Sequence, residues 1–195
     1  MAKLSVKNTH ESYGWVAIVL HWLMALVIFF LFGLGLYMVE LTYYDAWYKG
    51  SLDLHKSIGV SVFMLWCLRF IWRLMNVNPA MPKAKTAFER FEHLAAHWMH
   101  LALYLILLLL MCSGYLISTA DGRGIDVFDL FTVPAIPAFI DKQEDVAGDI
   151  HFYLAWTLMA MVAVHALAAI KHQLINKDNI LMRMVKPVSD KLAHD

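Results

Sequence analysis

Long apolar stretches restrict the folds open to this chain more than any other feature of its sequence. Four of them are long enough to cross a bilayer, which takes roughly 20 apolar residues of helix. We place these spans at about 15–39, 55–75, 97–118 and 150–171. A chain that crosses lipid must satisfy its own backbone hydrogen bonds, and an α-helix does so within one segment. We therefore predict an all-α integral membrane protein, a four-helix bundle that runs up, down, up and down, with a single domain over residues 1–195.

The composition narrows the kinds of partner and cofactor. Hydrophobic residues make up 61% of the chain, and its formal net charge is zero. A protein that binds nucleic acid carries a basic surface, so we expect membrane lipid and no nucleic acid among the partners. The two cysteines, Cys67 and Cys112, lie in apolar stretches and form neither a CxxCH motif nor a CxxC pair. Covalent haem attachment and a paired-cysteine metal site are thereby excluded.

The distribution of charges predicts the direction of the spans. The amino terminus, the 76–90 connection, the carboxyl tail and the adjoining helix ends carry 12 of the 16 Lys and Arg residues. The 40–56 and 119–149 segments carry the other four, together with ten of the 16 Asp and Glu residues. By the positive-inside rule, both termini are cytoplasmic and these two segments lie on the outer side. The outer side then has a net charge of −6.

Four histidines lie in the first, second and fourth spans. His151 and His165 are 14 residues apart, so at 100° and 1.5 Å per residue they share one helix face about 21 Å apart. His55 opens the second span on the outer side, as His151 opens the fourth. His21 and His165 lie equally far inside the cytoplasmic ends of the first and fourth spans. The sequence therefore predicts two pairs, His55 with His151 near the outer surface and His21 with His165 near the inner one.

Other polar residues lie near the inner pair. Arg69 follows His55 by 14 residues and repeats its helix face at the inner depth. Its guanidinium would suit a haem propionate, and snorkelling to the lipid head groups is the alternative. The third span carries three histidines on one face at i, i+4 and i+7, namely His93, His97 and His100. Counting back along that span places His100 at the interface, shallower than the paired histidines, where we expect hydrogen bonding or contact with a head group.

Imidazoles paired at matched depths indicate metal ligation. Ionisable residues inside a membrane are costly and mark function, although a hydrogen bond between helices is the alternative for any one of them. A structural zinc ion needs four ligands, whereas an iron porphyrin needs only two axial ones. We predict two non-covalent b-type haems, with His21 and His165 ligating one and His55 and His151 the other. Two axial imidazoles leave iron no open position, so we predict single-electron transfer and no catalytic residue.

Seven short motifs along the chain form a recognisable set. They are "HWLM" at 21–24, "LHKSIG" at 54–59, "HLALYL" at 100–105, "GYLISTADG" at 114–122, "HFYLAW" at 151–156, "VHALAAIKH" at 164–172 and "NKDNILMRM" at 176–184. With these motifs the chain resembles the bacterial cytochrome b561 family over nearly its full length. The resemblance implies an inner-membrane protein with the same two pairs of haem ligands. It also implies that His172 lies beside a quinone site, with ubiquinone as the electron partner; a helix cap is the alternative role of His172.

The resemblance extends to an activity, because one type of family member is similar to a superoxide oxidase that reduces ubiquinone. An anionic substrate is steered by positive potential, but the outer segments are acidic and only Lys56 is well placed to offset them. We therefore predict electron transfer between quinone and an outer-face donor or acceptor, with superoxide or a periplasmic redox protein as the outer partner. The alternatives are a cytochrome b anchor subunit of a periplasmic oxidoreductase complex and a haem-free transporter or proton relay.

Overall fold

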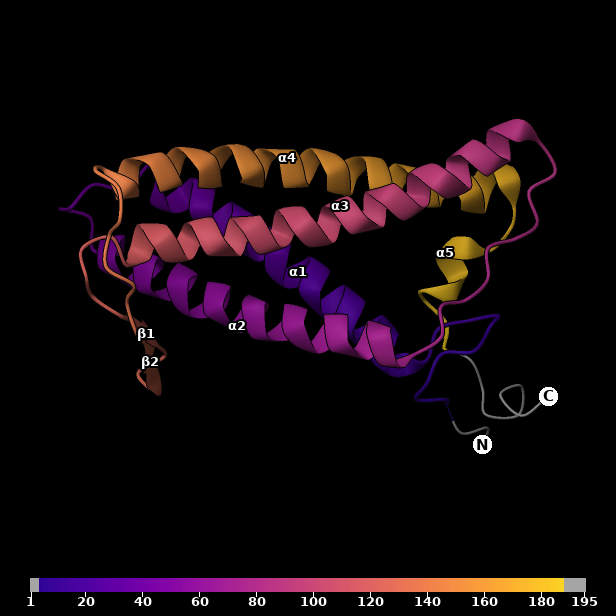
Figure 1. The fold of residues 1–195 in the computed structure, drawn as a ribbon, viewed down its shortest axis with the longest axis horizontal. Coiled ribbons are helices and arrows are strands. Elements are labelled where there is room, and N and C mark those ends of the chain that lie inside the picture. The colour runs from indigo at the N-terminus through magenta and orange to yellow at the C-terminus, as the bar shows by residue number, and fades with distance from the viewer. Residues whose placement is uncertain (1–3, 188–195) are drawn as a thin grey trace. The chain divides into compact units, whose positions relative to one another are not determined.

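Four long helices dominate the computed structural model, which describes residues 4–187 (Figure 1). They are α1 (Trp15–Met38), α2 (Tyr48–Met75), α3 (Ala87–Ser118) and α4 (Gln143–Lys171). All four are long and apolar enough to cross a membrane. The predicted all-α membrane fold with four spans is therefore confirmed. The cytoplasmic position of the termini stays a prediction.

Three helices begin well before the spans predicted from hydropathy. Helix α2 starts at Tyr48, α3 at Ala87 and α4 at Gln143, each in a segment with charged residues. Local interactions stabilise these polar first turns. Thr86 caps α3 by accepting a hydrogen bond from the backbone N–H of Glu89 at 3.1 Å. The first turn of α4 carries two carboxylates, which the helix dipole favours at an N-terminus.

Four short elements complete the fold of residues 4–187. Strands β1 (Ile125–Val127) and β2 (Phe131–Val133) form an antiparallel hairpin. Both residues at the start of its turn, Phe128 and Asp129, have positive φ angles of 49° and 58°, as a tight hairpin turn requires. A π-helical turn, η1 (His172–Asn176), continues α4, and the short helix α5 (Ile180–Arg183) follows it.

The chain divides into two compact units, and each contains one of the predicted histidine pairs. The first unit holds the described residues up to Leu23, Trp66–Leu103 and those from Ala160 on; the second holds Met24–Leu65 and Tyr104–Met159. His21 and His165 belong to the first unit, and His55 and His151 to the second. Each candidate site can therefore be described within its own unit.

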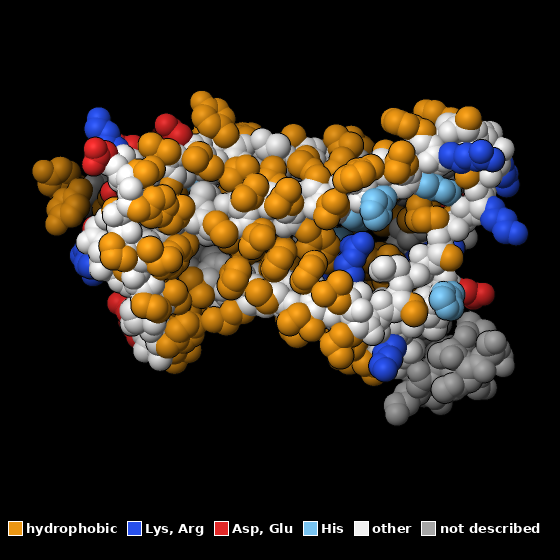
Figure 2. Space-filling model, in the orientation of Figure 1, with side chains coloured by type: hydrophobic (Ala, Val, Ile, Leu, Met, Phe, Trp, Pro, Cys, Tyr) orange, Lys and Arg blue, Asp and Glu red, His pale blue; other side chains and the backbone are white. Residues whose placement is uncertain are grey.

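Large apolar side chains remain exposed along the helices, as membrane lipid requires. Figure 2 shows hydrophobic side chains covering the visible faces of the long helices. Leu26 and Leu167, for example, are each 66% exposed. Water-soluble monomers rarely expose apolar patches of this extent. Several of the most buried side chains are instead small and polar, namely Ser51, Ser57 and Thr119.

Candidate haem sites

In the second unit the structure brings His55 of α2 beside His151 of α4. Their ring centroids are 6.3 Å apart, and the ring planes are inclined by 67°. A metal–imidazole bond is about 2.0 Å and the ligating nitrogen lies about 1.1 Å from its ring centroid, so two axial imidazoles on one iron have centroids about 6.2 Å apart. The observed separation therefore fits one metal atom between the two rings.

Glycines let these two rings lie close to neighbouring helices. A Cβ atom at Gly114 of α3 would lie 3.1 Å from Cε1 of His151, and one at Gly35 of α1 would lie 3.5 Å from Cε1 of His55. A Cβ atom at Gly59, one helical turn after His55, would meet nothing within 4 Å. Gly114 and Gly35 thus lie close to the two rings, whereas the space beside Gly59 on α2 is open. Open space one turn from His55 fits a flat, bulky ligand.

Hydrogen bonds fix the tautomer of His151. Its Nδ1 lies 3.0 Å from the carbonyl oxygen of Leu110 and 3.1 Å from Oγ of Ser113. Because the carbonyl only accepts, Nδ1–H donates to it and the lone pair is left on Nε2, as in most metal-ligating histidines. Nδ1 of His55 is buried and has no hydrogen-bond partner among residues 4–187. Such an unpaired buried atom calls for a partner outside the described protein atoms.

In the first unit His21 of α1 and His165 of α4 have nearly the same geometry. Their ring centroids are 6.4 Å apart, and the planes are again inclined by 67°. His100 of α3 lies closer to His165, at 5.2 Å between centroids. That distance is too short for two rings on opposite sides of one metal, so the spacing favours His21 as the second ligand. Within each predicted pair, the two imidazole rings are thus neighbours in the structure.

The contact of His100 with His165 differs from the shallower position expected from the sequence. Counting residues from the end of a span assumes that every helix has the same tilt, whereas tilts in membranes vary widely. His100 therefore belongs among the groups that surround the inner pair. The sequence signal that points to His100 is the i, i+4, i+7 face of the third span, for which we expected interfacial hydrogen bonding or contact with a head group.

Arg69 reaches the inner pair as predicted from its helix face. Its Nη2 lies 2.9 Å from Nδ1 of His21. A guanidinium only donates hydrogen bonds, so Nδ1 of His21 accepts and a neutral ring carries its proton on Nε2. Ligation of iron through Nε2 requires Arg69 to release Nδ1. A haem propionate is an anionic group toward which Arg69 can then turn.

His172 lies in the π-helical turn after α4, within the first unit. Its Nδ1 contacts Oδ2 of Asp178 at 2.6 Å, and the two side chains are only 12% and 18% exposed. Asp178 was not singled out from the sequence. It follows His172 by six residues, a spacing that does not place two side chains together on an α-helix.

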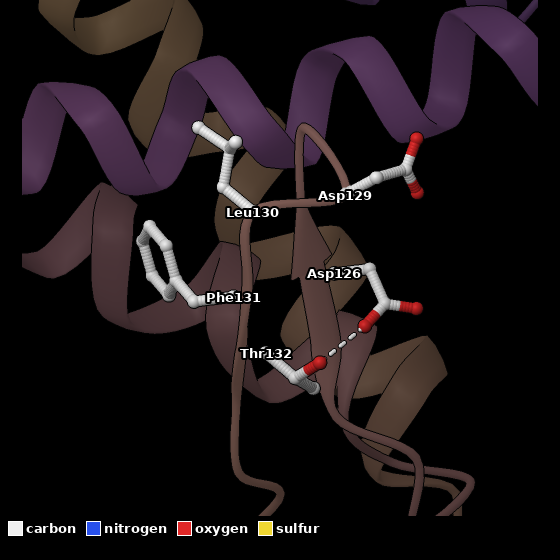
Figure 3. Close-up of a pocket in the computed structure, with 5 residues that line it drawn as sticks. All are labelled: Asp126, Asp129, Leu130, Phe131 and Thr132. Atoms are coloured by element: carbon white, nitrogen blue, oxygen red, sulfur yellow. Dashed lines mark hydrogen bonds between the residues drawn. The ribbon is translucent and has the colours of Figure 1, made fainter.

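The segment expected on the outer side is tied to the outer pair. Ser57, two residues after His55, donates to the carbonyl oxygen of Asp126 at 3.3 Å and accepts from the backbone N–H of Phe128 at 3.2 Å. The hairpin bears a shallow pocket of about 330 Å³ in which Asp126 and Asp129 point to the same side (Figure 3). This surface attracts cations rather than anions.

Lys56, the cation nearest to the outer pair in sequence, has acidic neighbours. Its Nζ lies 3.6 Å from Oδ1 of Asp53. Hydrogen bonds from Arg123 hold the pKa of Asp121 below its usual range, and the charge of Lys56 is a smaller cause. Asp121 is therefore ionised at neutral pH, and the charge of Lys56 is offset by Asp53 and Asp121.

Helices that cross the membrane, with imidazole pairs spaced for axial ligation of iron, define the class of helical membrane cytochromes b. The chain matches the family described as prokaryotic cytochrome b561 over residues 12–187, and it belongs to this family. It is accordingly a multi-pass inner-membrane protein of electron transport that binds b-type haem.

Relatives support this assignment. The chain is 44% identical to cytochrome b561 homolog 2 of Escherichia coli K12 over 183 residues, which cover 93% of this chain and 95% of the relative. It is 28% identical to the probable superoxide oxidase CybB of Yersinia pestis over 182 residues, 90% of this chain and 97% of the relative. Cytochrome b561 homolog 1 of E. coli K12 is also 28% identical, over 68% of this chain and 73% of the relative.

Proposed function

We propose that this protein binds two non-covalent b-type haems and transfers single electrons across the inner membrane between a quinone and an outer-face donor or acceptor. One observation supports the proposal above all others. Two histidine pairs, in separate units, have ring centroids 6.3 Å and 6.4 Å apart, as two axial ligands of one iron require. Bound haem supplies reversible one-electron transfer, and the remaining chemistry belongs to the chain.

The residues around each pair have distinct roles in this proposal. His55 and His151 hold the outer haem, and the carbonyl of Leu110 keeps Nε2 of His151 free for the metal. His21 and His165 hold the inner haem, with Arg69 pairing with a propionate. With two histidines for each haem, the chain would leave no place for a substrate to bind iron.

The inner electron partner in the proposal is ubiquinone, at a site beside His172. The resemblance of the tail sequence to the family supports this position, and a buried His172 paired with a carboxylate suits contact with a quinone carbonyl. Both termini, and therefore this site, are placed on the cytoplasmic side by the positive-inside rule.

The outer partner in the proposal is a cationic electron carrier rather than superoxide. The Yersinia pestis relative is named a probable superoxide oxidase, so superoxide oxidation is the second version of the function. The charge of the outer segments distinguishes a cationic carrier from superoxide as the outer partner. The segments expected on the outer side carry a net charge of −6, and Lys56 already has Asp53 as an ion-pair partner. A surface of this kind slows the approach of an anion and speeds that of a cation.

The spectrum of the purified protein tests the haem assignment. Reduction with dithionite in detergent should give a b-type α-band, and haem extraction should give two haems per chain. His151→Ala should remove one haem and leave the other, whereas the matched control His10→Ala, in an exposed residue, should retain both. One haem in the unmodified protein, or two in the His151 variant, would contradict the proposal.

Stopped-flow reduction then tests the partners. Ubiquinol, superoxide and a basic redox protein, horse cytochrome c in its reduced form, are mixed separately with the oxidised protein at low and high salt. A rate with the basic protein that falls as salt rises supports the cationic carrier. Fast reduction by superoxide that is insensitive to salt would favour the second version.

A further inference from the structure

We propose that Asp178 is a positioning residue for His172 and that the pair transfers a proton to a quinone at the inner site. The inference depends on the proposed quinone site. It starts from a hydrogen bond between Nδ1 of His172 and Oδ2 of Asp178, at 2.6 Å, between two side chains that are each mostly buried. The proposed function places His172 beside the quinone but gives Asp178 no role of its own.

The backbone makes an unusual reversal to bring the two side chains together. Helix α4 gives way to the π-helical turn η1, and Lys177 and Asn179 then adopt left-handed conformations with φ angles of 55° and 60°. The backbone N–H of Asp178 returns to the carbonyl oxygen of His172 at 3.4 Å. π-helical turns and left-handed residues other than glycine are costly and are concentrated at functional sites.

Two long-range hydrogen bonds hold this reversal in the first unit. Nε1 of Trp22 donates to the carbonyl oxygen of Met184 at 2.8 Å, and Nη1 of Arg183 donates to the carbonyl oxygen of Ala80 at 2.7 Å. Trp22 is the residue next to the inner ligand His21. Asp178 therefore lies on a turn that is fixed to the helix carrying that ligand.

The chemistry follows from the donor and acceptor roles. A carboxylate only accepts hydrogen bonds, so His172 donates through Nδ1–H and its Nε2 is left for a ligand. When the ring carries protons on both nitrogens, Nε2–H can donate to a quinone carbonyl while Nδ1–H stays bonded to the carboxylate of Asp178. When the imidazole is neutral, Nε2 can accept a hydrogen bond from a quinol hydroxyl.

The electrons and protons of quinone reduction can be accounted for with these two protonation states of His172. A quinone takes up two electrons, delivered one at a time from the inner site, and two protons to become a quinol. His172 supplies one proton through Nε2 and regains one from cytoplasmic water, and water supplies the other. No bond to the protein is formed. Quinol oxidation runs through the same groups in reverse.

The residue that follows His172 in sequence also has a polar atom without a partner among the described residues. Gln173 follows His172, and its buried Oε1 has no hydrogen-bond partner among residues 4–187. Nδ2 of Asn176 lies 3.3 Å from Nδ1 of His172, a longer contact than that of Asp178. On the other side of His172 in sequence, Lys171 is paired with Glu92. Unsatisfied buried oxygens are rare in proteins, so this oxygen calls for a partner outside the described protein atoms.

Substitution of Asp178 can separate charge from shape. Oδ1 of Asp178 also accepts the backbone N–H of Ile180 at 3.2 Å, which helps to shape the turn. Asp178→Asn keeps that acceptor and the size of the side chain but removes the negative charge beside Nδ1 of His172. Asp178→Ala removes both. Glu11→Gln, in an exposed residue of the same unit, is the matched control.

Two readouts are measured for each variant. Equilibrium binding of ubiquinone-1 to the oxidised protein gives a Kd, and stopped-flow reduction of the haems by ubiquinol-1 gives a limiting rate. We expect Asp178→Asn to lower the limiting rate about tenfold or more with a Kd within about threefold of the unmodified protein, because acid–base catalysis contributes on the order of 10²–10⁴ in rate. Asp178→Ala should weaken binding as well. Haem content and dithionite reduction should not change.

The outcomes separate this inference from the function on which it depends. If His172→Ala slows the quinol reaction but both Asp178 variants match the Glu11 control, the role of Asp178 is refuted and the quinone site stands. If Asp178→Asn matches the unmodified protein and only Asp178→Ala is impaired, Asp178 shapes the turn and the inference is again refuted. If His172→Ala leaves quinol binding and rate unchanged, the quinone site itself is refuted.

Discussion

Gly114→Ala tests how closely His151, a proposed ligand of the outer haem, must be held in position. The added Cβ would lie 3.1 Å from Cε1 and 3.3 Å from Nδ1 of His151. Ordinary carbon contacts are about 3.5–4.0 Å, so the ring must move by a few tenths of an ångström. The bonds from Nδ1 to Leu110 and Ser113 start at 3.0 Å and 3.1 Å and would then lie near the limit of a hydrogen bond.

The expected effect is on the haem rather than on the fold. Weakening one buried hydrogen bond costs about 0.5–1.5 kcal/mol, and misplacing an outer-shell partner of a metal ligand costs about 10–100-fold in affinity. Replacing a glycine inside a helix by alanine stabilises the helix by about 0.5–1 kcal/mol. We therefore expect roughly tenfold weaker binding of the outer haem with an unchanged or slightly higher melting temperature.

Haem titration of the stripped protein, followed by the α-band, measures the affinity of each site, and circular dichroism measures melting. Gly33→Ala is the matched control, because Gly33 is exposed on α1 and its added Cβ would meet nothing within 4 Å. Two haems bound with unchanged affinity in Gly114→Ala would show that His151 is not held against α3 as a ligand.

Three further predictions concern the surroundings of the sites. Arg69→Gln should shift the midpoint potential of one haem downward, since a nearby cation favours the reduced form, and redox titration would detect no shift if Arg69 faces the head groups. Ser57→Ala should increase protease cleavage in the 121–133 segment while both haems stay bound, because two hydrogen bonds to the hairpin are lost. Asp126→Asn combined with Asp129→Asn should slow reduction by a basic redox protein several-fold at low salt but not at high salt, and equal rates at both would contradict the proposed carrier.

The sequence predicted the main architecture because apolar length and helical periodicity are strong signals. Stretches of about 20 apolar residues allow few structures in a membrane. Equal depth then paired His55 with His151, and the structure has these rings side by side. Both signals depend on regular helices, in which position follows from residue count alone.

Features that apolar length and residue count do not encode could not be predicted in the same way. Asp178 contacts His172 only because a π-helical turn and two left-handed residues reverse the chain. Helix α2 begins at Tyr48 within a polar segment that hydropathy assigns to the outer loop. His100 contacts His165 at a depth that depends on helix tilt, which residue counting does not give.

The attachment of the hairpin at Ser57 has a consequence for how members of such a family can diverge. Ser57 reaches the hairpin through main-chain atoms only, the carbonyl of Asp126 and the N–H of Phe128. The outward side chains of the hairpin can therefore be replaced without loosening its anchor to the helical turn that carries His55. The partner recognised by the hairpin surface can therefore change during evolution without a change in the position of His55.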